Sequence, residues 1–193
     1  MTQGVVSCHP MQMRASLTIL ILFFTDSTSS IGCLPKCRVT IYCMKDFVNT
    51  SQKMRTYKIS KQGTIRCKHN QMRAITPQYI VYNRTFLHNE QRRSIILQGE
   101  FHVRHRNLMD VYAIDLGPRL LCTETLLYMA KNASCGVVMI HPAGNGVTYY
   151  ELRVRNAYIA TVPDRHCGSH FRRVAGSGVF TYRPDCKNMT MPR

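Results

Sequence analysis

The chain has no tryptophan and few acidic residues: 10 Asp and Glu stand against 26 Lys and Arg in 193 residues. It also lacks internal repeats and low-complexity segments, which argues against a repeat architecture. The apolar run at 17–24 is too short to cross a membrane, since a transmembrane helix needs about 20 residues. The formal net charge of +16 favours polyanions such as nucleic acid, heparan-like glycans or acidic membranes, without choosing among them.

The same apolar run has the features of a secretory signal peptide. Arg14 precedes it, and the small residues Ser29, Ser30 and Gly32 follow it at a suitable distance for cleavage. We therefore predict a signal peptide at 1–32 and one domain at 33–193, secreted and without a membrane anchor. A single domain is the usual arrangement for a chain of this length.

The cysteines and glycosylation motifs fit this route. Of nine cysteines, Cys8 lies in the predicted signal peptide, and an even number behind such a peptide indicates disulfides rather than zinc. The predicted disulfide cysteines are Cys33, Cys37, Cys43, Cys67, Cys122, Cys135, Cys167 and Cys186, with their pairing left open. The candidate glycosylation sites are Asn49, Asn83, Asn132 and Asn188.

Short β-strand patterns dominate the chain. The clearest is at Cys135–Leu152, where a buried-strand run ends at His141, followed by a Gly/Asn turn and a second strand. One short helix is expected within 44–54, and residues 163–169 are expected to be a loop. These patterns predict an antiparallel sheet, either α+β with a helix packed on it or a closed barrel.

Several segments resemble the guanyl-specific fungal ribonucleases, in the order in which that family has them. The match covers roughly residues 40–150 and includes 42–43, 76–79, 94–97 with Gly99, 117–122 and 136–141. The resemblance implies a disulfide-stapled, microbial ribonuclease-like α+β fold with one N-terminal helix. Residues from about 152 onward extend beyond the family's usual end.

The residues that the family uses for catalysis are not matched. The general-base position falls at Arg92 or Arg93, the upstream histidine is Gln78, and His141 is displaced by one residue. A displacement by one residue turns a strand side chain to the opposite face. This predicts a scaffold without catalytic activity. An active ribonuclease that uses Glu100, Arg119 and His141 is the other possibility within this family.

Inactive, secreted forms of this kind are found among the ribonuclease-like effectors of powdery-mildew fungi. The Tyr42–Cys43 pair resembles their tyrosine–cysteine motif, and the resemblance implies a disulfide from Cys43 to Cys186 or to Cys135. It also implies a virulence effector that binds host RNA or a host protein, and leaves open whether the effector enters host cells.

Basic residues interleaved with aromatic ones suggest where such a partner would bind, because this mixture is typical of sequence-tolerant RNA contacts. A solvated strand face would give the same pattern. The candidates for RNA or partner contact are Arg119, His141, Arg153, Arg155, Tyr79 and Tyr149.

No metal or cofactor is predicted. His102 and His105 would point to opposite faces of a strand, and Cys167, beside His166, is expected to form a disulfide. The alternative function from a different class is a secreted, lipocalin-like β-barrel that carries a small ligand. The missing tryptophan, and with it the usual G-x-W of the first strand, counts against that alternative.

Overall fold

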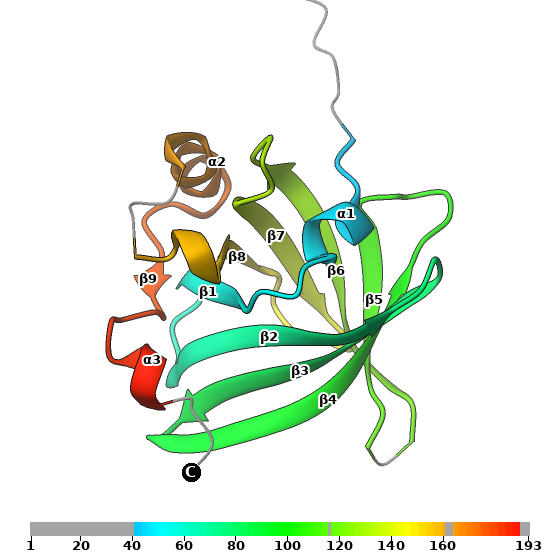
Figure 1. Ribbon diagram of the computed structural model, residues 1–193, viewed down its shortest axis with the longest axis horizontal. Coiled ribbons are helices and arrows are strands. Elements are labelled where there is room, and N and C mark those ends of the chain that lie inside the picture. The colour runs from blue at the N-terminus through cyan, green and yellow to red at the C-terminus, as the bar shows by residue number, and fades with distance from the viewer. Residues whose placement is uncertain (1–40, 116, 161–163, 190–193) are drawn as a thin grey trace, which may run out of the picture. The chain divides into compact units, whose positions relative to one another are not determined.

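The computed structural model describes residues 41–115, 117–160 and 164–189. The predicted signal peptide, Cys33 and Cys37 lie outside this part, as does the side chain of Asn188. The described chain forms an antiparallel sheet that curls into a closed barrel (Figure 1). Among the described residues, no helix has the length and apolar character needed to cross a membrane.

The barrel contains eight strands in sequence order, and β1 pairs with β2 to close it. The strands are β1 (Met54–Ile59), β2 (Ile65–Ile75), β3 (Tyr79–His88), β4 (Gln91–Phe101), β5 (Leu108–Ala113), β6 (Arg119–Met129), β7 (Cys135–Pro142) and β8 (Tyr149–Arg155), and the short β9 (Val179–Phe180) pairs with β1. The helices are α1 (Met44–Val48), the 3₁₀ helix η1 (Asn156–Tyr158), α2 (Arg165–Ala175) and α3 (Cys186–Met189). The predicted ribonuclease-like α+β fold is therefore wrong.

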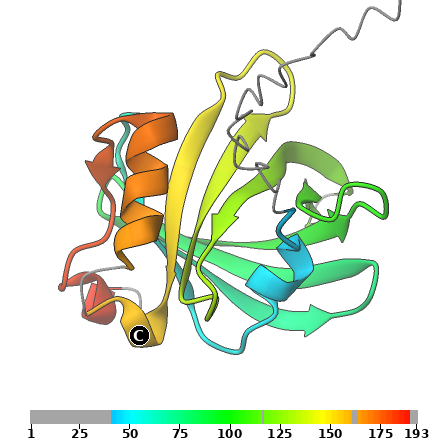
Figure 2. The same ribbon diagram turned by 90° about the horizontal axis from the view of Figure 1, so that it is seen from above.

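Helix α1 lies at one end of the barrel and closes it (Figures 1 and 2). Met44 and Phe47 are fully buried in the apolar core inside the barrel. The Phe47 ring lies against Gly136, where a side chain would collide with it. The helix predicted within 44–54 is thus present over its first half, whereas Met54 already belongs to β1.

The seam between β1 and β2 is short, and the C-terminal segment extends it. The two strands pair only at Met54↔Asn70 and Arg55↔His69. Beyond these pairs Thr181 lies between the strands: the Cys67 amide donates to its carbonyl oxygen (2.8 Å), and its own amide donates to Tyr57 (3.1 Å). The C-terminal segment thus supplies the backbone partners that the diverging strands would otherwise lack.

Two disulfides hold the C-terminal elements on the barrel. Cys67 pairs with Cys186, which follows the seam segment, and Cys135 on β7 pairs with Cys167 on α2. The pairings of Cys43 with Cys186 or Cys135 implied by the resemblance are therefore wrong. Within the described part, Cys43 and Cys122 form no disulfide.

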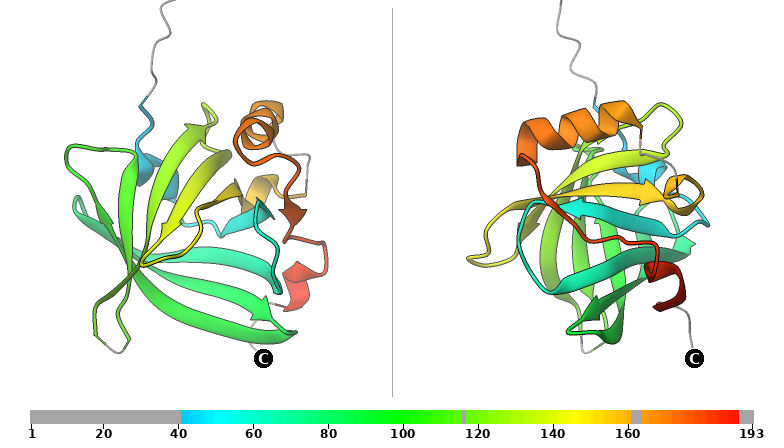
Figure 3. Two further views of the ribbon diagram at one scale, coloured as in Figure 1. Left: turned by 180° about the vertical axis from the view of Figure 1, so that it is seen from behind. Right: turned by 90° about the vertical axis from the view of Figure 1, so that its left-hand side faces the viewer.

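Helix α2 lies across the outside of β7 and β8 (Figure 3). The Asp164 carboxylate caps its first turn by accepting from the His166 amide (2.8 Å), and Gly176 ends it at φ 69°. Only Cys167 and Phe171 of its residues are buried, so its hydrophobic pattern is sparse. For this reason the prediction of a loop at 163–169 is wrong over its helical part.

The contact between α1 and β7 gives a test of this packing. A Cβ atom added at Gly136 would lie 2.8 Å from both Phe47 Cζ and the Tyr128 carbonyl oxygen. We expect Gly136→Ala to lower the free energy of unfolding by about 1–3 kcal/mol, the usual cost of overpacking a core. Urea unfolding followed by circular dichroism measures this change.

Gly63→Ala is the matched control, because a Cβ atom there meets nothing within 4 Å. Equal stability losses in the two variants would contradict the packing described for α1.

Candidate functional site

Five charged side chains point into the middle of the barrel. They come from four strands and form what we call the ion cluster: Lys68 (β2), Arg84 (β3), Glu124 (β6), Glu151 and Arg153 (β8). Side-chain exposure is 8% for Lys68, 10% for Arg84 and 1% or less for the other three. The strand period of two residues places Glu151 and Arg153 inside, while Leu152 and Val154 face outward and pack beneath α2.

Arg153 joins the two carboxylates of the cluster. Its Nη1 and Nη2 atoms donate to Glu124 Oε2 (2.6 Å) and Oε1 (2.8 Å), and its Nε donates to Glu151 Oε2 (2.8 Å). Arg84 also donates to Glu124 Oε1 (2.9 Å), and Lys68 donates to Glu151 Oε1. Every charge in the cluster therefore has an oppositely charged partner, as burial requires.

The pKa values follow from these contacts. Burial alone would raise the pKa of Glu124, but Arg153 and Arg84 outweigh burial and lower it to about 2. Burial would likewise raise the pKa of Glu151, whereas Lys68 and Arg153 lower it. Burial lowers the pKa of Lys68 to about 8, and the Arg84 charge acts in the same direction. Near neutral pH all five groups are charged.

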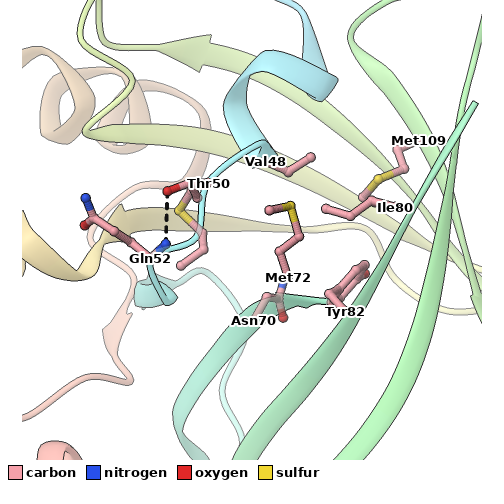
Figure 4. A pocket seen from close by; sticks show the side chains of 9 residues that line it. Val48, Thr50, Gln52, Asn70, Met72, Ile80, Tyr82 and Met109 are labelled. Carbon is pink, nitrogen blue, oxygen red and sulfur yellow. Dashed lines mark hydrogen bonds between the residues drawn. The ribbon is translucent and has the colours of Figure 1, made fainter. Parts of the chain in front are cut away.

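An apolar pocket lies between the ion cluster and α1. Figure 4 shows the side chains that line it. The volume of the pocket is about 20 Å³, and it is lined mainly by methionine, isoleucine and valine side chains. The Tyr82 ring forms part of its wall, and the Tyr82 hydroxyl accepts from Arg84 Nη2 (3.3 Å). The cluster thus separates this pocket from the opposite end of the barrel.

The opposite end is formed by the loops that follow β1, β3, β5 and β7, and we call it the mouth. A pocket of about 220 Å³ opens there between β2, the loop at 60–64 and the C-terminal segment. Lys68 lines this pocket together with Lys61, Arg66, Tyr149 and Phe180, and we call it the Lys68 pocket. Lys68 therefore links the buried cluster to the mouth.

A second pocket at the mouth lies on the opposite side of the barrel. Its apolar wall is Ile95, Ala113 and Leu121, and Asp115 and Arg119 stand at its edge. The mouth thus combines apolar inner walls with charged groups at its rim, a composition typical of small-molecule sites.

The residues predicted for RNA or partner contact do not form one surface. Arg153 is inside the barrel, Tyr149 lines the Lys68 pocket, and Arg155 donates to the Phe47 carbonyl oxygen (3.3 Å) near α1. Arg119 stands at the mouth. The two others lie apart: His141 is exposed and bonded to Thr148 Oγ1 (2.8 Å), and Tyr79 is exposed at the start of β3.

Of the candidate glycosylation sites, Asn49 and Asn132 are exposed and Asn83 is half-buried on β3. Sequence reasoning missed four members of the ion cluster: Lys68, Arg84, Glu124 and Glu151. The available signal was the presence of two acidic residues in segments of β-forming residues. Glu124 lies between Thr123 and Thr125, and Glu151 lies two residues before Arg153 and so on the same strand face.

Comparisons with known proteins identify the architecture. No family model and no curated protein matches the chain. Among solved structures, a crystal structure of an AM182 serotonin complex aligns at TM-score 0.59 with 20% identity, over 76% of this chain and 94% of that one. Apocrustacyanin C2 aligns at TM-score 0.53 with 10% identity, over 73% and 83% of the two chains. Japanin from Rhipicephalus appendiculatus, bound to cholesterol, aligns at TM-score 0.52 with 10% identity, over 68% and 91%.

These likenesses show a lipocalin-like barrel and overturn the ribonuclease-like effector interpretation. The matched ribonuclease segments are short strand motifs, and strands 94–97, 119–122 and 136–141 here belong to a continuous barrel. The predictions of RNA binding and of a host RNA or host protein partner are wrong as well, because the fold that they assumed is not the one found and the predicted contact residues lie apart.

The ion cluster makes acid stability a direct test of its role. Because the pKa of Glu124 is about 2 in the folded protein and 4.5 ordinarily, its contribution is present above pH 4.5 and is lost as the pH falls toward 2. We expect Glu124→Gln to lower the free energy of unfolding by about 3–5 kcal/mol near neutral pH, since Arg153 and Arg84 lose their carboxylate. The loss should shrink over that acid range in urea unfolding curves.

Glu100→Gln, at an exposed position on β4, is the control and should change stability little. If both substitutions have the same effect at every pH, the cluster does not stabilise the barrel as described.

Proposed function

We propose that this protein is a secreted, non-catalytic carrier that binds a small organic molecule in the mouth of its barrel. The observation that carries the proposal is the Lys68 pocket, which leads from the mouth to a buried ion cluster inside a closed barrel. A preformed concave site with apolar walls and a few fixed polar groups is what a small ligand needs.

The rigidity of the site supports binding. The barrel closes by β1–β2 pairing, and the two disulfides fix the C-terminal segment that forms one wall of the Lys68 pocket. A site held in its bound shape loses little entropy on binding. Two neighbours of the same fold were solved with small molecules, AM182 with serotonin and japanin with cholesterol.

The ionisation and pairing of the groups in the ion cluster favour ligand binding over acid–base catalysis. General acid–base work at neutral pH needs a group whose pKa lies near 7. Both carboxylates here are held ionised by their cationic partners, with pKa values far below that range. Lys68 has a pKa of about 8, but its ammonium is committed to an ion pair with Glu151. Secretion is supported by the two disulfides, which persist in oxidising compartments, and by the N-terminal sequence pattern.

A bulky residue in the pocket tests the proposal. We expect the neutral fluorophore N-phenyl-1-naphthylamine to bind with saturation at one molecule per chain. Ile65→Trp fills part of the Lys68 pocket, so it should weaken this binding at least about tenfold in a fluorescence titration.

Val103→Trp is the control, because this side chain is 94% exposed in the loop between β4 and β5 at the α1 end. Equal binding of the probe by these two variants would contradict a carrier site at the mouth.

A further inference from the structure

We infer that the ligand of the Lys68 pocket is a small organic anion whose carboxylate, sulfonate or phosphate group contacts Lys68. This inference rests on the proposed carrier function and names its ligand class. It follows from two observations: the carboxylate acceptors of the ion cluster are occupied while Lys68 has donors to spare, and the charged residues that line the pocket are positive.

The acceptors of the cluster are already in use. Each of the four oxygens of Glu124 and Glu151 accepts at least one hydrogen bond from Arg84, Arg153, Lys68 or Thr56. A cationic ligand would therefore have to displace one of the protein's own cations before it reached a carboxylate.

The donors of the cluster are not exhausted. An ammonium group has three N–H donors, and among the described residues the Lys68 ammonium donates to one partner, Glu151 Oε1. Three cations and two carboxylates also leave the cluster with a net charge of +1. A buried excess positive charge with spare donors is satisfied by an anion.

The other charged side chains of the Lys68 pocket are positive as well. Lys61, Arg66 and Arg183 line it, and there is no Asp or Glu among its lining residues in the described chain. Arg66 is paired with Glu90 and Asp185 outside the pocket lining, whereas the Lys61 ammonium lies 4.2 Å from the centre of the Tyr149 ring. A concave site lined by one sign of charge concentrates ions of the opposite sign.

The remaining lining is apolar and aromatic. Ile59, Ile65, Val179 and Phe180 line the pocket together with the Tyr149 ring. The fitting ligand therefore has an apolar or aromatic body as well as its anionic group. Serotonin, bound by AM182, carries an amine of the opposite charge, for which this cluster offers no unoccupied carboxylate oxygen.

Two fluorophores that share one aromatic skeleton and differ only in a sulfonate group distinguish the effect of ligand charge from that of ligand shape. We expect 1-anilinonaphthalene-8-sulfonate to bind the native chain at one molecule per chain, at least about tenfold more tightly than neutral N-phenyl-1-naphthylamine. Lys68→Gln should remove this preference by weakening the sulfonate probe about tenfold while leaving the neutral probe unchanged. Serotonin should not compete with either probe.

Lys68→Gln could disturb folding because Lys68 belongs to the buried ion cluster, so a second variant is needed. Lys61→Gln serves, because Lys61 is exposed and outside the ion cluster. It should weaken the sulfonate probe about threefold, whereas Lys131→Gln, in the β6–β7 turn at the other end, should not. Equal affinity for the two probes, or competition by serotonin, would overturn the anion inference and leave the carrier intact. If neither probe binds, the carrier function itself fails.

Discussion

A bidentate ion pair between Arg153 and Glu124 holds the interior of this barrel together. Arg84, Lys68 and Glu151 extend the pair, so that β2, β3, β6 and β8 are tied through one buried network. An unpaired charge at this depth would cost several kcal/mol, and a slip of one residue in any of these strands would turn its charge outward. The network therefore specifies the register of the barrel as well as its electrostatics. It also divides the interior into an apolar end beneath α1 and a basic mouth.

The mouth depends on the C-terminal segment as much as on the barrel strands. Because β1 and β2 pair over only two residues, Thr181 completes the seam between them, and Val179 and Phe180 become part of the wall of the Lys68 pocket. The Cys67–Cys186 disulfide fixes this segment next to the strand that carries Lys68. Residues beyond about 152, which the ribonuclease resemblance leaves outside the family, here form the end of β8, η1, α2, β9 and α3. One covalent link thus stabilises both the closure of the fold and the shape of the proposed site.

The sequence predicts the local structure better than the global arrangement. The strand–turn–strand at Cys135–Leu152 and the involvement of Cys67, Cys135, Cys167 and Cys186 in disulfides are confirmed. A closed barrel was one of two architectures that the pattern allowed. The choice between them was wrong because short strand motifs in the right order do not reveal which strands pair. The ion cluster escaped prediction for a related reason. Alternation in β8 separates its two faces, but it cannot show that the charged face is buried inside the barrel while α2 covers the apolar one.

The proposed function and its ligand class both require that an anion reaches Lys68 inside the mouth. The most direct measurement is a crystal structure of the native chain with bound 1-anilinonaphthalene-8-sulfonate. We predict that the sulfonate lies within hydrogen-bonding distance of Lys68 Nζ, with the aromatic rings against Tyr149 and Phe180. A probe bound outside the barrel, for example along α2, or seated in the mouth with its sulfonate pointing to solvent, would contradict the account.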